Sequence, residues 1–306
     1  KTILIVVNIL LLGFNICVFN HKKPIPVKPP IIQKVEPVEQ KPLVFKTDFI
    51  SPTRDMTFSE IDKQLQKWAS ECKEIVTYGT YGKTQSGKAI PYLRIGNKKG
   101  PKVCIASCIH GNEHLAAMVT MGFVGNVLNN YPEWKELLAT RDIYYIPVIC
   151  PDSYERVSRE DMRTDPNRNF TDRNLGEINS IPAIQSLKDF QIENNFKAFM
   201  SCHNYGEVYL FPWGYAQKPT ESDSEYRRIL GKMASVSGYK YEQLLRQSAP
   251  PYYGYEADWF YKHGAFSIVN EIGKHFQPSK AEIETEVRIN LKAIRIFIEE
   301  APLVRK

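Results

Sequence analysis

The chain has 306 residues, of which 43% are hydrophobic and 24% are charged, so it can bury a large core and is not intrinsically disordered. Most of its formal charge of +6 comes from the first 48 residues, since the remainder carries 33 basic and 31 acidic residues. That remainder has no run of Lys and Arg, so we expect no nucleic-acid partner.

The N-terminal part is apolar and then rich in proline. Residues 2–19 carry no charge, which predicts a signal peptide or a membrane anchor within residues 1–20. No small-x-small cleavage pattern is evident, which favours an uncleaved anchor. Residues 21–48 contain six prolines, typical of an extended linker. We therefore predict an exported chain, membrane-anchored or secreted, that contacts the membrane only here and has its globular domain at 49–306.

The globular part alternates between helical and extended patterns. We expect a helix over residues 58–72, two strands within 74–97 and a strand over 101–109. The patterns further predict helices over 114–130, 182–195, 222–237 and 279–300, and strands over 142–150, 198–202, 206–214 and 265–272. Because helical stretches separate the strands, and those near residues 103, 144, 199 and 267 are apolar runs, we predict an α/β fold whose sheet is covered on both faces.

The six cysteines do not suggest a disulfide framework. Cys104 and Cys108 lie four residues apart on one predicted strand, so their Cα atoms would be about 13 Å apart, too far to bridge. We expect buried free thiols, with a bridge involving Cys150 or Cys202 as the alternative in an exported chain.

Three side chains with metal-binding chemistry follow predicted buried strands. His110 and Glu113 come after the apolar run 104–109, and His203 follows the strand 198–202. A strand end fixes the backbone while its side chains stay accessible. Two imidazoles and a carboxylate suit zinc with a fourth position open to water, although copper binds such sets too. We therefore predict one zinc ion per chain at these residues.

A second zinc motif overlaps the first. The sequence HGNEH (110–114) also fits H-x-x-E-H, in which His110 and His114 are ligands on one helix and Glu113 is the base. Gly111 and Asn112 have low helix propensity and directly follow a strand. We therefore favour Glu113 as a ligand.

An ordered series of stretches resembles the zinc metallocarboxypeptidases of the carboxypeptidase A type. It covers roughly residues 55–300 and comprises HGNE (110–113), PDSYE (151–155), DPNRNF (165–170), SCHNYGEVYLFPWG (201–214), EADW (256–259) and FSIVNEIG (266–273). The resemblance implies a three-layer α/β/α sandwich around a mixed, twisted, mostly parallel sheet. It also implies an enzyme that removes the C-terminal residue of a peptide. We expect the chain to act as a monomer.

The resemblance assigns roles to further residues. Glu271 would be the general base that takes a proton from a zinc-activated water. Asp165 would orient His110 through its other ring nitrogen. Asn167 and Arg168 fall where the family binds the terminal carboxylate of the substrate, and a guanidinium fork matches a carboxylate.

Other assignments depart from the family pattern. Arg159 is our choice for stabilising the oxyanion, with Arg163 and Arg156 as alternatives in the same short loop. Tyr205 is expected to line the cleft. The mobile tyrosine of the family has no counterpart at strict spacing, so we assign its place to Tyr252, with neighbouring Tyr253 as the alternative.

The resemblance also bears on substrate preference. Ala257 occupies the position at the floor of the family's specificity pocket, where an acid would select basic terminal residues. A small apolar side chain there predicts no strong basic preference, although neighbouring Glu256 leaves one open.

Two other functions stay open from the residues alone. One is a hydrolase of cell-wall (murein) stem peptides with the same metal chemistry. The other is a non-catalytic module that holds peptide C-termini in the cleft. The presence of all three candidate zinc ligands and of Glu271 argues against this second function.

Overall fold

The computed structural model describes residues 45, 47, 52, 54–171, 181–246 and 253–303. The predicted anchor at 1–20, nearly all of the linker at 21–48 and Tyr252 lie outside these residues, so their assignments stay predictions. Phe45, at the end of the predicted linker, is buried and packs edge-on against Tyr131, with ring centroids 5.2 Å apart. Among the described residues, no helix is both long and apolar enough to cross a membrane.

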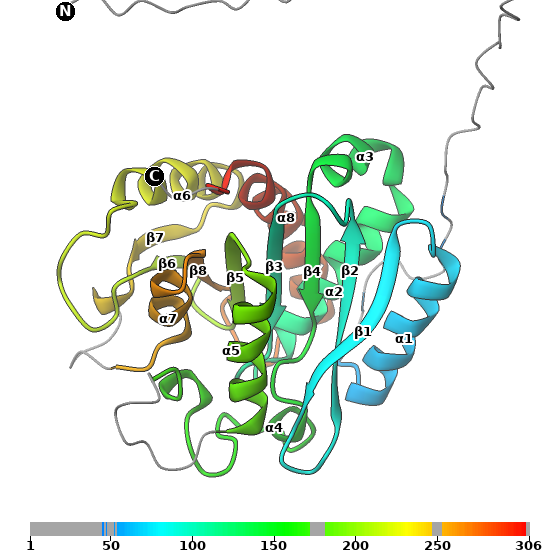
Figure 1. Ribbon diagram of the computed structural model, residues 1–306, viewed down its shortest axis with the longest axis horizontal. Coiled ribbons are helices and arrows are strands. Elements are labelled where there is room, and N and C mark those ends of the chain that lie inside the picture. Colours follow the sequence, from blue (N-terminus) through cyan, green and yellow to red (C-terminus); the bar gives the residue numbers. More distant parts are fainter. Residues whose placement is uncertain are drawn as a thin grey trace, which may run out of the picture. The chain divides into compact units, whose positions relative to one another are not determined.

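A mixed sheet of eight strands runs through the middle of the fold (Figure 1). Its strand order is β1-β2-β4-β3-β5-β8-β6-β7, in which β4, β3, β5 and β8 are parallel neighbours, as are β6 and β7. The strands are β1 (Val76–Lys83), β2 (Ala89–Gly96), β3 (Lys102–Ser107), β4 (Asp142–Ile146), β5 (Ala198–His203), β6 (Val208–Phe211), β7 (Lys240–Gln243) and β8 (Phe266–Glu271). The predicted mixed, mostly parallel sheet is confirmed.

Helices cover both faces of this sheet. They are α1 (Phe58–Glu71), α2 (His114–Asn129), α3 (Tyr131–Thr140), α4 (Pro151–Glu155), α5 (Pro182–Asn194), α6 (Asp223–Ser237), α7 (Glu256–Lys262) and α8 (Lys280–Glu300). In Figure 1, α5 and α7 lie in front of the sheet and α2 and α8 behind it. On β3, Val103 and Ile105 join the core under α2 and α8, whereas Cys104 and Ala106 join the core under α5 and α7. This alternation within an apolar strand confirms the predicted three layers.

Proline shortens two strands relative to the sequence prediction. The strand predicted over 142–150 ends at Ile146, directly before Pro147, and the one predicted over 206–214 ends at Phe211, directly before Pro212. Proline has no amide N–H to donate to a neighbouring strand.

The sequence patterns missed α3, α4, α7 and β7. Helix α7 has six buried residues out of seven, so no polar stripe marks its helical period. The prediction of buried free thiols is confirmed for the described residues, whose five cysteines are all buried and free.

Adjacent strand ends bring distant parts of the sequence together. The parallel strands β3, β5 and β8 are neighbours, and their carboxyl ends meet at one edge of the sheet. His203, the last residue of β5, pairs directly with Glu271, the last residue of β8. Ligands of open α/β sheets bind outside the carboxyl ends of the strands. This edge is therefore where a site is expected.

A buried polar network holds α8 against the strand that carries Glu271. The Asn270 side chain donates to Asn290 Oδ1 at 2.9 Å, and Asn290 Nδ2 donates to the Tyr239 hydroxyl at 3.1 Å. That hydroxyl in turn donates to Glu286 and accepts from the Gly273 amide at 3.1 Å. Since buried polar groups are costly when unpaired, this network fixes β8 relative to α8.

We predict that Asn290→Leu lowers the free energy of unfolding by about 1–3 kcal/mol, because it leaves the Asn270 amide and the Tyr239 hydroxyl short of partners. Chemical denaturation of the folded domain measures this change. Arg288→Leu, at an exposed position of the same helix, is the matched control and should stay within about 0.5 kcal/mol of the parent. Equal stability of the two variants would contradict the role of the network.

Candidate active site

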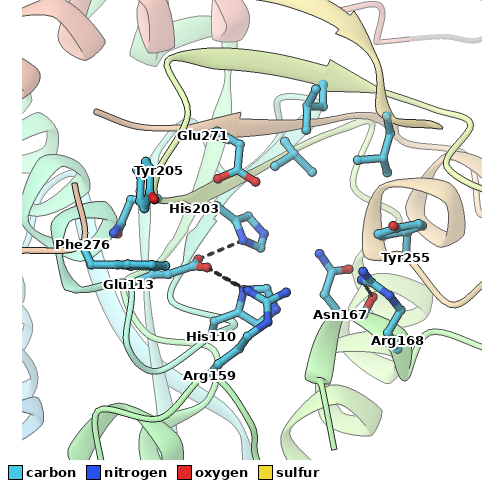
Figure 2. A pocket seen from close by; sticks show the side chains of 14 residues that line it. His110, Glu113, Arg159, Asn167, Arg168, His203, Tyr205, Tyr255, Glu271 and Phe276 are labelled. Carbon is cyan, nitrogen blue, oxygen red and sulfur yellow. Dashed lines mark hydrogen bonds and ion pairs between the residues drawn. The ribbon is translucent and has the colours of Figure 1, made fainter. Parts of the chain in front are cut away.

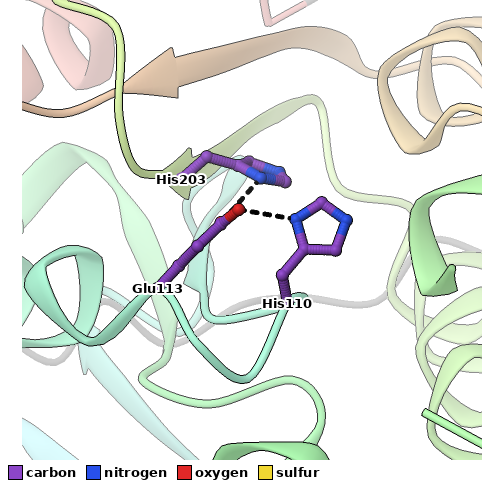
Figure 3. Close-up of side chains that lie close together, drawn as sticks. All are labelled: His110, Glu113 and His203. Atoms are coloured by element: carbon purple, nitrogen blue, oxygen red, sulfur yellow. Dashed lines mark hydrogen bonds and ion pairs between the residues drawn. The ribbon is translucent and has the colours of Figure 1, made fainter. Parts of the chain in front are cut away.

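His110, Glu113 and His203 meet at the edge where the parallel strands end (Figure 3). His110 Nδ1 lies 2.7 Å from Glu113 Oε1, and His203 Nδ1 lies 2.9 Å from Glu113 Oε2. One nitrogen or oxygen of each side chain lies within 4.8 Å of the others, a spacing that allows all three to hold one metal ion. All three side chains are buried. The fold thus brings together the three residues chosen from the sequence.

The electrostatics of this group fit a divalent cation. Burial favours the uncharged forms, but His203 and His110 lower the pKa of Glu113, and Glu113 raises the pKa of both histidines. Glu113 Oε2 accepts no hydrogen bond of good geometry from the described residues, although it is buried. A buried carboxylate oxygen without a hydrogen bond is costly unless a positive charge compensates it. Zinc bound through two nitrogens and this carboxylate would supply that charge.

The second ring nitrogen of each histidine faces a carboxylate. His110 Nε2 lies 2.9 Å from Asp165 Oδ1, the arrangement expected from the sequence. His203 Nε2 lies 2.5 Å from Glu256 Oε1, a contact that the sequence analysis missed. The sequence offered one signal for this contact, namely that Glu256 is an acid in the EADW stretch. Spacing along the chain could not reveal that its side chain points toward His203 on β5.

The loop between β3 and α2 places His110 and Glu113. A Cβ at Gly111 would lie 2.0 Å from the carbonyl carbon of Ser153, so only glycine fits there. Helix α2 begins at His114, after both ligands, so His110 and His114 do not share a helix. His114 instead stacks on Tyr154, with ring centroids 4.0 Å apart. The H-x-x-E-H alternative, which needs a continuous helix, is therefore wrong.

Glu271 lines the same cavity as the three candidate metal ligands and lies close to His203 (Figure 2). It ends β8 beside His203 and is only partly exposed. Burial raises its pKa to about 7, against opposing effects of the histidines and Arg159. A carboxylate with such a pKa can accept and return a proton near neutral pH.

Arg159 is the arginine that reaches this group. Its Nη1 lies 3.3 Å from His110 Nδ1 and 3.6 Å from Glu113 Oε1, and its Nη2 lies 3.0 Å from Asp165 Oδ2. The two alternatives, Arg156 and Arg163, line a different cavity. The structure therefore places Arg159, rather than either neighbour, where an oxyanion could be stabilised.

Asn167 and Arg168 lie on a short 3-10 helix (Pro166–Arg168) at the opposite side of the cavity from Tyr205 (Figure 2). The Arg168 guanidinium lies over the Tyr255 ring, 4.1 Å from its centroid, and donates to the Asn167 carbonyl at 2.8 Å. Gly254, with φ of +83°, approaches the Arg168 carbonyl so closely that a Cβ there would lie 2.4 Å from its oxygen. The segment before α7 is thus packed tightly on the 3-10 helix.

The remaining predicted residues differ in their placement. Tyr205 lines the cavity and packs edge-on against Phe276, with centroids 4.9 Å apart. Tyr253, the described member of the tyrosine pair, is 70% exposed and stacks on Tyr215 away from the cavity lining. Ala257 is fully buried in an apolar cluster and does not line the cavity.

An apolar wall closes one part of the cavity, whose volume is about 520 Å³. It consists of Leu210, Leu244, Val269 and the ring of Tyr255, which belong to the same cluster as Ala257. Leu210 on β6 pairs directly with Val269 on β8. The sequence analysis missed these residues, because apolar side chains in strands are expected in the core. Only the antiparallel pairing of β6 with β8 turns two of them toward the site.

Comparison with known proteins decides the family. A family model described as zinc carboxypeptidase matches residues 61–293, well over half of the chain. The chain belongs to the zinc carboxypeptidase family. The resemblance found in the sequence motifs is thereby confirmed.

Curated relatives are similar at modest identity. Carboxypeptidase A4 of Mus musculus is 25% identical over 243 residues, which cover 66% of this chain and 58% of the relative. Carboxypeptidase B of Homo sapiens is 26% identical over 247 residues, which cover 67% of this chain and 59% of the relative. The matched part of this chain therefore spans less than two thirds of these relatives.

Solved structures share the fold. Thrombin activatable fibrinolysis inhibitor has a TM-score of 0.75 at 20% identity, covering 81% of this chain and 75% of its own. Carboxypeptidase A from Helicoverpa armigera has a TM-score of 0.74 at 20% identity, covering 81% of this chain and 74% of its own. These similarities confirm the α/β architecture predicted for this chain.

We predict that zinc binding releases protons and weakens as the pH falls. Since Glu113 raises the pKa of His110 and His203, protein prepared without metal holds protons that neutral imidazole ligands must lose. The affinity should drop about tenfold per pH unit for each proton displaced. Calorimetric titration in buffers of different ionisation enthalpy counts these protons. His275→Ala, at an exposed histidine, should leave the count unchanged, and binding without proton release would refute this electrostatic account.

Proposed function

We propose that this chain is a zinc-dependent carboxypeptidase that hydrolyses the C-terminal peptide bond of peptides. The observation that carries the proposal is one cavity in which His110, Glu113 and His203 face Glu271, with Asn167 and Arg168 on its far side. A metal group, a base and a carboxylate-binding pair in one cavity are the parts that such a reaction requires. Family membership supports the same activity.

Zinc, when bound, lowers the pKa of a coordinated water to about 7 and polarises the carbonyl of the scissile bond. In this proposal Glu271 takes the proton of the attacking water and then gives it to the leaving amine. Its raised pKa suits both transfers. Arg159, beside His110, would stabilise the negative charge that develops on the carbonyl oxygen.

Asn167 and Arg168 would bind the terminal carboxylate of the peptide. The guanidinium of Arg168 is held against Tyr255, which limits its motion and keeps its positive charge in the cavity. A carboxylate bound there would orient the last peptide bond toward the zinc group. This arrangement favours removal of a single terminal residue over cleavage within a peptide.

The apolar wall bears on the preferred terminal residue. The apolar cluster that contains Leu210, Leu244 and Val269 includes no acid, and the acids among the described residues that line the cavity are Glu113 and Glu271, to which this proposal gives other roles. Transfer of an apolar side chain from water to such a wall is favourable, whereas a cationic one would lose hydration without a partner. We therefore propose a preference for apolar terminal residues.

The setting of the enzyme is also a proposal. The uncharged run at 2–19 and the proline-rich linker support export and attachment to a membrane through the N-terminal segment, or secretion. The near-neutral charge of the globular part supports peptides, rather than nucleic acids, as substrates. The monomeric state expected from the sequence is part of the same proposal. No observation on the described residues favours cell-wall stem peptides, so these enter only as a substrate to test.

We predict that Glu271→Gln lowers kcat by about 10²–10⁴-fold, because the amide cannot accept the proton. Zinc content, measured by mass spectrometry, should stay near one per chain, since Glu271 is not among the ligands. His203→Ala should instead lose both zinc and activity. Glu284→Gln, at an exposed glutamate of α8, is the control and should retain full turnover. Unchanged turnover of Glu271→Gln would refute the mechanism, and zinc binding by the parent without turnover of any peptide would indicate a binding module.

We predict that peptides ending in Phe or Leu have a kcat/KM at least about 10-fold above those ending in Lys or Asp, because of the apolar wall. Peptides with an amidated C-terminus should resist cleavage, because Arg168 then lacks its carboxylate partner. Timed mass spectrometry of a panel that differs only in the last residue measures both effects. Faster release of Lys than Phe would contradict the first expectation. Turnover of muropeptides in preference to the panel would favour the cell-wall function instead.

A further inference from the structure

We propose that Glu256 is a positioning residue that orients His203 for zinc and ties it to the carboxylate-binding pair. The proposal rests on the proposed function, since it concerns the zinc group and the substrate site of that enzyme. Asp165 holds His110 in the same way, so each histidine of the group would have its own carboxylate behind it.

The contacts of Glu256 support this role. Glu256 is the first residue of α7 and is fully buried. Its Oε1 lies 2.5 Å from His203 Nε2, and the other ring nitrogen of His203 faces Glu113. Its Oε2 accepts no hydrogen bond from the described residues. The Glu256 carboxylate is shielded from water, and its contact with His203 is shorter than its contact with Asn167.

The chemistry of imidazole explains what this contact does. A neutral histidine carries its proton on one ring nitrogen, and only the other nitrogen can bind a metal. A carboxylate at Nε2 favours the tautomer with Nδ1 free, fixes the plane of the ring and increases the basicity of Nδ1. Because both groups are buried, this interaction is not weakened by water. Glu256 would therefore raise the affinity of His203 for zinc.

The same residue also contacts the substrate side of the cavity. The Glu256 amide donates to Asn167 Oδ1 at 2.8 Å, and Asn167 Nδ2 lies 3.4 Å from Glu256 Oε1. The Glu256 side chain therefore contacts both Asn167 and His203. The start of α7 is itself anchored, since Ser267 donates to the Ala257 carbonyl at 2.6 Å and Asp258 accepts from the Gly214 amide at 3.0 Å. This anchoring keeps the zinc group and the carboxylate-binding pair at a fixed separation.

The competing role for Glu256 is selection of a basic terminal residue. A selecting acid has to present an oxygen to the cavity, but Glu256 has 0% of its surface exposed and is not among the residues that line the cavity. The oxygen Oε1 is already taken by His203. The geometry therefore favours positioning, and the experiment must separate the two roles.

Zinc affinity, measured by competition with a chromophoric chelator, tests the proposal without requiring turnover. Glu256→Ala should bind zinc about 10–100-fold more weakly than the parent, and Glu256→Gln, which keeps the shape but loses the charge, at least about 5-fold more weakly. Asp165→Asn should weaken zinc in a similar way through His110. Glu155→Gln, which removes a surface ion pair with Lys88, is the control and should bind zinc normally.

Thermal unfolding of the metal-free variants separates positioning from a general loss of structure. Glu256→Gln should unfold near the temperature of the parent while its zinc affinity falls. If Glu256→Ala fails to fold, Glu256→Gln still decides the matter. Parent-like zinc affinity of folded Glu256→Gln would overturn the proposal.

Two further outcomes separate this inference from the function on which it rests. If the parent itself binds no zinc, the proposed function fails first and the inference fails with it. If Glu256→Gln keeps parent-like zinc affinity but loses turnover of peptides that end in Lys or Arg, Glu256 is a specificity residue and the inference alone is wrong.

Discussion

The burial of the Glu113 carboxylate is the constraint on which the site depends. An ionised carboxylate inside a protein is costly unless positive charge and hydrogen bonds surround it, and here two imidazoles approach it within 3 Å. One comes from the loop after β3 and the other from the end of β5. The parallel pairing of these strands therefore serves the electrostatics of the site as well as the stability of the sheet.

Around this group the cavity divides into regions of different chemistry. Arg159 and Arg168 place positive charge at two separate positions, next to the metal group and next to Tyr255. The apolar wall includes Leu210 and Val269, which pair directly across two adjacent strands and belong to one apolar cluster. A peptide end has matching parts: a carbonyl, a terminal carboxylate and a side chain. The cavity thus presents a group that matches each of these parts, as the proposed function requires.

Rigidity behind the site comes from groups that never face the cavity. Asp165 and Glu256 hold the far sides of the two histidines, and a buried network around Asn290 holds β8 against α8. The contacts of Glu256 and Asn290 are made in the interior, where a lost partner is expensive, and that of Asp165 is partly buried. The arrangement of the candidate zinc ligands therefore depends on α7 and α8, which lie more than 50 residues from His203 in the sequence.

The sequence by itself indicated the fold class and the three candidate metal ligands, because short apolar strands followed by His or Glu are local patterns. The role expected of Glu271 came from the resemblance to a family. Motif order was sufficient to indicate the family and the roles expected of Asn167 and Arg168. Only the tertiary structure showed that Arg159, rather than Arg156 or Arg163, lines the cavity with the candidate metal ligands. Only it revealed the contact of Glu256 with His203 and the apolar wall. The physical reason is that the direction of a side chain from a loop or a buried helix depends on which strands pair, and pairing is a long-range property that local periodicity does not record.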